Sequence, residues 1–560
     1  MENRAILAAV LMAVVVLLWQ MLFMPSPPAP PPADKTDQRP AQPATTPPAP
    51  PAPQPVPTAV PVPAPVSPAP RAPQRTATVD TPLYHAVISS EGGKFLEWTL
   101  HYRGEKRLIA IGELGPRGLM LGPKGAALDV VPLSLEASEI RLGAGSRERD
   151  LVMTGEDPYG IRVTQIARFR ADDYTIDVTI RLENARQVSQ EVEVMLPWVA
   201  PVKPPAQPTS EHVQWPTEAS GAAGGPRDLA AVVQNRNAGE WVGLGNMYYL
   251  AALKARGPGL EAAVDKEGDA NARIALRGSV TLAPGQRWEA RAQIYAGPKE
   301  YDRLKSHDLQ GAINFGNFLW IPFLPMELFA VPVLWLMHFF YRFVGNYGVS
   351  IILLTVITKI VFYPLTVKSM SSMKKMQGLQ PQVNALKAKF KSEPQRAQQE
   401  MMELYRKQGV NPLGGCLPML IQVPIFYALY VTLSVAVELQ NAPFVCFGHV
   451  PAGVPVIGGT DLWICDLASY DPTYILPVLM TVTMFIQQKM TPTTGDPQQA
   501  KMMLMMPVVF GGMFIIYPIA SGLTLYWTVS NVLQILQQSL MNRGKPARSA
   551  GSGAKDAVRA

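Results

Sequence analysis

The sequence is poor in cysteine and histidine, and it shows no catalytic constellation. Its 560 residues include three cysteines and six histidines. Cys416, Cys446 and Cys465 are too few and too irregularly spaced for a disulfide framework or a zinc motif. No nucleophile is paired with a base in the apolar segments, so we expect a protein without covalent chemistry. We also expect no cofactor and no metal.

Charged residues are scarce as well. They make up 17% of the chain, well below the roughly 25% of soluble domains. Hydrophobic residues reach 48%, and several apolar runs are long enough to cross a bilayer, which takes ~20 residues of a helix. The net charge of +7 is concentrated in short loops beside these runs. That distribution indicates membrane topology and not a DNA partner.

The N-terminal region combines an apolar segment with a proline-rich one. Residues 1–24 have the positive flank and apolar core of a signal peptide, but no small-x-small cleavage site precedes the prolines. We expect an uncleaved transmembrane anchor, with a cleaved signal as the alternative. Residues 25–75 hold 21 of the 55 prolines. Such a composition favours an extended, semi-rigid linker.

Residues 76–314 change to a period of two. The stretch from Tyr174 to Leu182 alternates apolar and polar residues throughout. Four more stretches alternate less regularly: 162–169, 191–196, 273–282 and 288–295. Many such strands separated by Gly and Pro turns predict an all-β sandwich domain. The sequence gives no sign of what this domain binds.

Residues 315–343 are apolar but unusually aromatic. They also contain Glu327, His338, Arg342 and three prolines. Aromatic crowding and broken helicity suit the membrane interface better than the centre of the bilayer. We therefore predict an interfacial amphipathic helix here.

Five clean apolar spans follow, at 344–367, 413–437, 472–489, 502–519 and 521–540. The loop from Lys368 to Lys407 contains nine Lys/Arg and three Glu, whereas residues 408–488 contain no Lys or Arg. The tail, 541–560, has five basic residues and one acidic residue. By the positive-inside rule these segments predict six transmembrane helices in all, with both termini in the cytoplasm and the sandwich outside.

One full charge lies deep in a core span. Lys359 follows Thr355 and Thr358 in the first of the five spans, where a cation costs at least ~2.5–3.5 kcal/mol. It could reach the cytoplasmic interface along its own stem, or it could make a water-filled groove electropositive. Polar residues on other spans favour a groove, although they could also bond helix to helix. They are Gln422, Thr524, Thr528, Ser530, Asn531 and Gln534.

The basic loop reads as a helical hairpin over 368–408. Met370, Met373 and Met376 recur at helical spacing among lysines. Methionines make an adaptable surface for varied partners, or they pack the hairpin against itself.

Several blocks of this sequence resemble the YidC/Oxa/Alb family of membrane protein insertases, in its Gram-negative form. They are Tyr363–Met376 with Leu379–Pro381, Asn411–Pro418 with Gln422–Phe426, Pro492–Thr494, and Ser521–Trp527 through Asn531. Their order and spacing cover about 340–540. The anchor ending Trp19-Gln20 and the outer sandwich also match the family by position.

This resemblance implies a five-helix core, 344–540, around a hydrophilic groove that is open to the cytoplasm and to lipid. It implies an inner-membrane insertase and chaperone that handles nascent membrane proteins from the ribosome, alone or with the Sec translocon. Lys359 stands where the family carries a basic residue, usually Arg. Thr355 falls at a family substrate-contact position, and Tyr526 and Trp527 fall at two aromatic positions of the last span that the resemblance places in the groove. The basic tail suits ribosomal RNA or anionic lipid.

Two other functions stay open from the residues alone: a small-solute transporter or channel, and a chaperone that binds without inserting. A transporter usually shows acidic residues mid-span and internal repeats, and neither is visible.

Cys446 and Cys465 fall in the outer loop between the third and fourth of the six spans. Because that compartment is oxidising, and Gly and Pro lie between them, we expect that they can form a disulfide. The alternative is two reduced, apolar side chains.

Overall fold

The computed structural model describes residues 74–108, 118–202, 213–214, 217–221, 224–228, 236–268, 270–316, 325–391, 393–409, 417–449, 461–491, 497–517 and 519–543. The predicted anchor, the linker as far as residue 73 and the tail from residue 544 lie outside these ranges.

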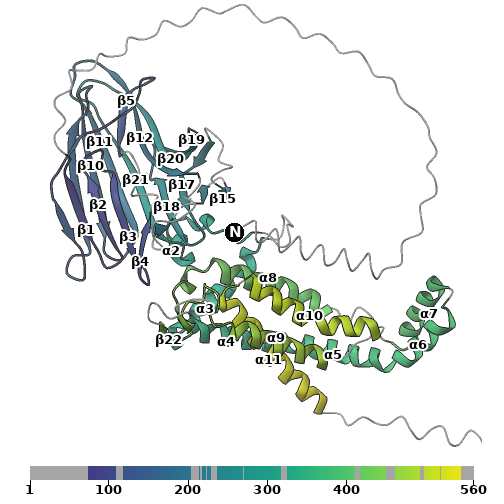
Figure 1. Ribbon diagram of the computed structural model, residues 1–560. Helices are drawn as coiled ribbons and strands as arrows, with labels where there is room; N and C mark the ends of the chain where they lie inside the picture. The colour runs from purple at the N-terminus through teal and green to yellow at the C-terminus, as the bar shows by residue number, and fades with distance from the viewer. Residues whose placement is uncertain are drawn as a thin grey trace, which may run out of the picture. The chain divides into compact units, whose positions relative to one another are not determined.

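Residues 76–298 form the predicted all-β domain, built from three sheets (Figure 1). The six-stranded sheet has the order β13 (Val213–Gln214), β4 (Glu105–Leu108), β3 (Phe95–His101), β2 (Tyr84–Ser89), β1 (Thr76–Asp80), β8 (Glu139–Arg141). The nine-stranded sheet has the order β15 (Gly224–Asp228), β14 (Glu218–Gly221), β17 (Trp241–Gly245), β18 (Tyr249–Ala255), β21 (Arg287–Pro298), β11 (Thr175–Asn184), β10 (Ile161–Arg170), β9 (Glu148–Glu156), β7 (Leu133–Leu135). A third sheet has the order β16 (Arg236–Gly239), β19 (Glu261–Glu267), β20 (Asn271–Leu282), β12 (Gln190–Pro201), β5 (Met120–Pro123), β6 (Asp129–Val130).

The alternation in the sequence corresponds to the burial of these strands. The five stretches with period two coincide with β10, β11, β12, β20 and β21. In β11 the apolar residues Ile176, Val178, Ile180 and Leu182 are buried, while the polar residues between them are partly or fully exposed. Successive side chains of a strand point to opposite faces, so one face of the sheet is apolar. The prediction of a β domain is confirmed.

Large aromatic residues join the sheets across the core. Trp98 of β3 is fully buried, and its indole Nε1 donates to the carbonyl of Ala296 in β21 at 3.1 Å. The Tyr84 ring stacks on Trp98 at a centroid distance of 4.2 Å. The sheet that contains β3 and the nine-stranded sheet that contains β21 therefore pack face to face, as in a sandwich.

Helices make up the rest of the described chain. They are α2 (Tyr301–Ser306), η2 (Gln310–Ala312), α3 (Glu327–Val344), α4 (Tyr347–Val361), α5 (Tyr363–Gly378), α6 (Gln380–Lys389), α7 (Pro394–Lys407), α8 (Leu417–Val435), η5 (Val437–Leu439), α9 (Ile475–Met490), α10 (Pro497–Ile516) and α11 (Ser521–Arg543). A two-stranded hairpin, β22 (Val445–His449) and β23 (Asp461–Ile464), precedes α9. In the basic segment 368–408, α6 and α7 pack against each other.

Two elements differ from the sequence expectation. The span expected at 344–367 is divided, because α4 ends at Val361 and α5 continues at an angle of 57°. Pro364 lies in the first turn of α5, and a proline has no N–H to continue the preceding helix. The broken helicity expected in 315–343 is wrong for its described part, since α3 runs through Pro332 without a break.

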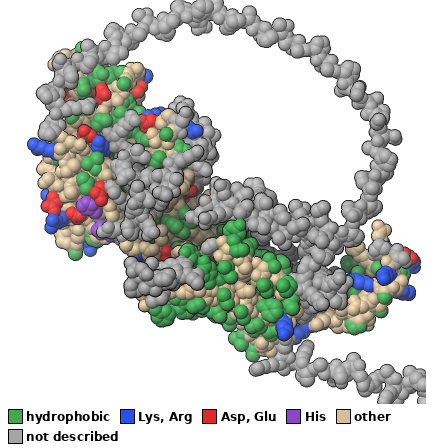
Figure 2. Space-filling view, in the orientation of Figure 1, with side chains coloured by type: hydrophobic (Ala, Val, Ile, Leu, Met, Phe, Trp, Pro, Cys, Tyr) green, Lys and Arg blue, Asp and Glu red, His purple; other side chains and the backbone are tan. Residues whose placement is uncertain are grey.

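Among the described helices, α3 alone is long and apolar enough to cross a membrane unaided, and the bent pair α4–α5 is a second candidate. The remaining apolar helices expose their apolar side chains all the same. Of the large apolar residues that are exposed in the described ranges, every one except Val188 lies at or after Leu328. Figure 2 shows these hydrophobic side chains gathered over the helical region.

Candidate substrate-binding site between the helices

Lys359 lies near the end of α4 and points toward α11. The side chain of Asn346 caps the start of α4 by accepting from the Val349 N–H at 3.1 Å. Along its length α4 packs against α11. The Lys359 Nζ donates to Oε1 of Gln534 on α11 at 3.1 Å. This hydrogen bond connects α4 to α11 about three turns after the start of each helix.

The charge of Lys359 is not neutralised by a carboxylate of the described residues. Lys359 is partly buried, and the ion pairs of the described chain do not include it. A neutral amide oxygen can satisfy one N–H of the ammonium, but it leaves the positive charge in place. The space around Lys359 therefore keeps a positive potential.

A buried polar stripe on α11 continues from this lysine. Thr524, Thr528 and Asn531 are 5%, 8% and 6% exposed, and their spacing puts them on one face of the helix. The Thr528 hydroxyl donates to the carbonyl of Thr524 at 2.8 Å. The Asn531 Nδ2 donates to Oγ1 of Thr483 on α9 at 3.4 Å. The stripe thus links α11 to α9 as well as to α4.

The two threonines of α4 are bonded to their own helix. Thr355 is fully buried, and its hydroxyl donates to the Ile351 carbonyl at 2.6 Å. The Thr358 hydroxyl donates to the Thr355 carbonyl at 2.8 Å. Such back-bonding satisfies the hydroxyl proton inside an apolar environment. Each oxygen keeps lone-pair capacity to accept a further hydrogen bond.

The adjacent aromatic residues Tyr526 and Trp527 have different surroundings. Tyr526 is 2% exposed and its phenol bonds Ser530 of the same helix. Trp527 lies in an aromatic cluster, with centroids 4.7 Å from Phe426 of α8 and 5.6 Å from Phe514 of α10. The two residues therefore do not share a surface.

The remaining predicted residues lie on other elements. Gln422 is in α8, but its side chain is outside the described set. Met370 of α5 is 7% exposed and Met376 is partly buried, whereas the side chain of Met373 is not described. The burial of Met370 agrees with a packing role for this methionine.

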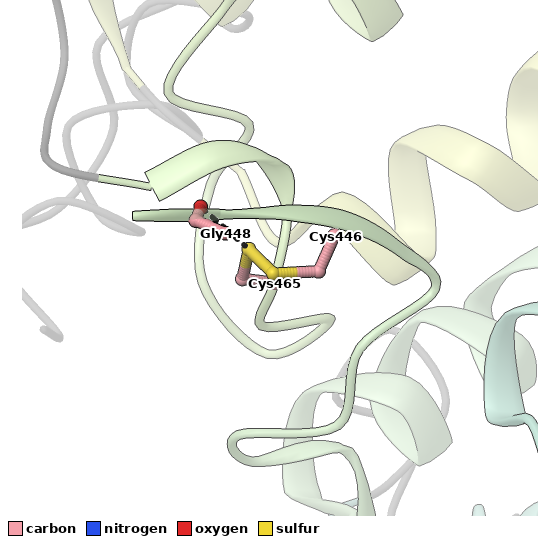
Figure 3. The surroundings of a disulfide bond; sticks show 3 residues. All are labelled: Cys446, Gly448 and Cys465. Carbon is pink, nitrogen blue, oxygen red and sulfur yellow. Dashed lines mark hydrogen bonds between the residues drawn. A yellow bond between two sulfur atoms is a disulfide. The ribbon is translucent and has the colours of Figure 1, made fainter. Parts of the chain in front are cut away.

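Cys446 of β22 and Cys465, directly after β23, are joined by a disulfide with an S–S distance of 2.00 Å and a Cα–Cα distance of 4.7 Å (Figure 3). Cys446 is the strand partner of Trp463. The bond therefore closes the open side of a two-stranded hairpin.

Thr483 is a site residue that the sequence alone does not indicate. It is uncharged, and threonines occur at many positions of apolar helices. A signal exists in its register: Thr483 lies two turns after Leu476 on the buried side of α9, whereas its neighbour Val482 is 48% exposed. That register becomes visible once α9 has been placed beside α11.

An all-β domain, followed by helices with apolar outer faces and a polar interior, is the architecture of an integral membrane protein with a large extramembrane domain. Two family models match the chain. The model of the 60Kd inner membrane protein matches residues 339–548, and the model of the YidC periplasmic domain matches residues 76–329.

Similar proteins cover the whole chain. The membrane protein insertase YidC of Geobacter metallireducens is 36% identical over 98% of this chain and 100% of its own length. The YidC insertase of Oleidesulfovibrio alaskensis is 37% identical over 97% and 100%. A solved structure of an active YidC insertase covers 85% of this chain and 94% of its own, at 21% identity and a TM-score of 0.35. The chain belongs to the YidC family of membrane protein insertases, and residues 76–329 are its periplasmic domain.

Proposed function

We propose that this protein moves nascent transmembrane segments from the cytoplasm into the inner membrane, and that the polar cluster around Lys359 receives the polar end of each segment. The observation that carries the proposal is the bond between Lys359 and Gln534. The neutral amide of Gln534 does not neutralise the charge of Lys359. The lysine inside the helical bundle can therefore still attract a carboxylate.

The physical role of the cluster is to replace water around a polar segment. An isolated charge inside a bilayer costs at least ~2.5–3.5 kcal/mol. An acidic tail that arrives beside Lys359 lowers this cost for both partners, while Thr358 and Asn531 offer hydrogen bonds in place of hydration. These contacts are reversible, so the tail can be released on the periplasmic side of the membrane. No covalent step is needed.

The apolar part of a substrate would travel along the outside of the bundle. Val478 and Val482 of α9 and Val509 and Ile516 of α10 are 50%, 48%, 57% and 71% exposed. In a bilayer these side chains contact lipid, and an apolar helix can replace lipid there at little cost. The same face therefore serves lipid and substrate.

The proposed topology has six spans, with both termini in the cytoplasm and α3 lying in the interface. Trp335, Phe339 and Phe343 of α3 are exposed at 65%, 41% and 75%, and Glu327 begins the helix. An aromatic face beside a charged end suits the boundary between lipid and water. The distribution of Lys and Arg supports the orientation.

Partners are proposed from charge. The segment from α5 to α7 and the C-terminal tail are basic, as a docking site for ribosomal RNA or anionic lipid requires. Work beside the Sec translocon is proposed from the family resemblance.

The test uses purified protein in liposomes and one short-tailed substrate with an acidic translocated tail. The measurement is the rate at which the tail becomes protected from added protease. We expect Lys359→Ala to lower this rate about tenfold, which corresponds to a barrier higher by ~1.4 kcal/mol. Lys359→Arg should keep the rate because it keeps the charge. The matched control is the same substrate with Asn and Gln in place of its acidic residues, on which the two variants should differ little. Full activity of Lys359→Ala on the acidic tail would overturn the proposal.

A further inference from the structure

The hairpin β22–β23 displays a pair of stacked aromatic rings. The rings of Phe447 and Trp463 lie 6.0 Å apart with an interplanar angle of 7°. Phe447 is 71% exposed. The exposed Phe447 ring and the Trp463 ring beneath it leave an apolar surface that a membrane or another partner can cover.

The base of the hairpin is fixed to the starts of two helices. The Nδ2 of Asn346, the residue that caps α4, donates to the Phe444 carbonyl at 3.0 Å. A side chain at Gly348 would collide with the Phe444 ring, so the glycine lets the hairpin lie against the first turn of α4. After the hairpin, the Leu467 carbonyl accepts from the Gly522 N–H in the first turn of α11 at 2.9 Å.

These two contacts show at which end of the helical bundle the stacked rings lie. Lys359 and Gln534 lie further along α4 and α11, so the hairpin is at the opposite end of the bundle from the lysine. Phe343, 75% exposed, lies in the last turn of α3, three residues before Asn346. The exposed rings of Phe343 and Phe447 thus occur near one level, where the helices leave the membrane in the proposed topology.

Charge distinguishes between the partners that could cover this ring. Residues 408–488 contain no Lys or Arg, so the hairpin offers anionic headgroups no cation. Aromatic rings favour the boundary between headgroups and acyl chains irrespective of lipid charge. We propose that the hairpin is a membrane anchor, whose exposed Phe447, supported by the partly buried Trp463, inserts into the interface of the outer leaflet by apolar burial alone. The inference rests on the topology given under the proposed function.

The disulfide keeps the anchor in shape. Cys446 directly precedes Phe447, and Cys465 follows Trp463 by two residues. A two-stranded hairpin is only marginally stable by itself. The bond holds the two strands together beside the stacked rings, so we expect its loss to let the rings separate and leave the interface.

The experiment places photoreactive benzoylphenylalanine at position 447 of the full-length protein in phosphatidylcholine vesicles. After irradiation, phospholipid adducts are counted by mass spectrometry. Matched sites are Val478, which is 50% exposed on α9, and Val188, which is 55% exposed on the β domain. We expect adducts at 447 near the level at 478 and several-fold above the level at 188. Adding phosphatidylglycerol should leave the yield unchanged.

The disulfide arm repeats the measurement with Cys446→Ser and Cys465→Ser together. Adducts at 447 should fall several-fold, while those at 478 stay unchanged. The anchor is wrong if position 447 labels no more lipid than 188, if it crosslinks to a protein, or if labelling depends on anionic lipid. Low labelling at 478 as well would instead overturn the proposed topology, and the anchor with it. Insertion activity, measured in the same vesicles, reports separately on the proposed function.

Discussion

Trp98 and Trp335 show how differently two regions of one chain use the same side chain. Trp98 is fully buried among the strands of the periplasmic domain and bonds the Ala296 carbonyl. Trp335 of α3 is 65% exposed and stacks on Phe339 at 5.8 Å. The β domain hides its apolar residues, as a protein in water must. The helical region displays them, because its solvent is the bilayer.

The largest contrast is expected from removing these two tryptophans. Trp98→Ala should lower the stability of the β domain by about 3–5 kcal/mol, because it leaves a cavity between two sheets. Trp335→Ala should change the stability of the detergent-solubilised helical region by less than about 1 kcal/mol, since its ring fills no core. Amide hydrogen exchange of β2, β3 and α4 in the purified protein measures both effects. Similar losses at the two sites would contradict the comparison.

The next contrast places a lysine at two exposed valines. Val482 of α9 is 48% exposed and Val188 of the β domain is 55% exposed. If lipid covers α9, Val482→Lys should cost about 2.5–3.5 kcal/mol. Val188→Lys should cost within about 0.5 kcal/mol, as surface changes in water do. The thermal stability of both variants in lipid nanodiscs checks this. A harmless lysine at 482 would mean that water reaches this face of α9.

The β domain also contains a buried carboxyl, and this gives a pH-dependent prediction. Asp157 is 6% exposed; its Oδ1 accepts from the N–H groups of Tyr159 and Ile161. Its Oδ2 is buried without a hydrogen-bond partner among the described residues. Burial raises the pKa of Asp157 to about 6, against these two hydrogen bonds. Below about pH 6 the folded domain therefore favours the protonated acid.

Because the folded pKa lies above the ordinary value, the stabilising contribution is complete below about pH 4 and is lost as pH rises through 6. A difference of roughly two units corresponds to at most about 3 kcal/mol. Asp157→Asn should remove this component of the pH dependence, as measured by hydrogen exchange of β10 between pH 4 and 7. Asp150→Asn is the control of opposite sign. A hydrogen bond from Arg168 lowers the Asp150 pKa, so that contribution is lost as pH falls. An Asp157→Asn variant with the parent's pH profile would refute the assignment.

The sequence predicts the β domain better than it predicts the helical interior. Alternation located β10 and β11 to within a residue or two of their ends, since burial of one face fixes a period of two. It did not give the pairing of β11 with β21, which joins residues more than a hundred positions apart. No local pattern encodes a partner that distant.

In the helical region, charge identified Lys359, and polar composition identified the stripe on α11. What the sequence could not give is which helices meet. Lys359 bonds Gln534, and Asn531 bonds Thr483, because α11 packs between α4 and α9. The division of the first core span at Phe362 was also missed, although Pro364 marks it. Apolar residues continue across this point, and composition alone gave no boundary.

The smallest expected effect distinguishes a substrate site from ordinary bonding between helices. Thr483 accepts from Asn531 and donates to the Met480 carbonyl. Thr483→Val keeps the shape of the side chain and removes both bonds. Interhelical hydrogen bonds in membranes contribute about 0.6 kcal/mol on average, so the melting temperature of the protein in nanodiscs should hardly change.

Insertion of the acidic-tailed substrate is the second measurement on Thr483→Val. If the stripe only joins helices, the rate should follow the small loss in stability. If the stripe replaces water around the substrate, the variant leaves the Asn531 amide without its partner in the path of the tail, and we expect insertion to slow several-fold at nearly unchanged stability. Thr481→Val is the matched control, because the Thr481 hydroxyl donates to the Pro477 carbonyl of its own helix. If Thr481→Val slowed insertion as much as Thr483→Val, the effect would come from replacing any threonine of α9 by valine. The polar stripe would then have no specific role in receiving the tail.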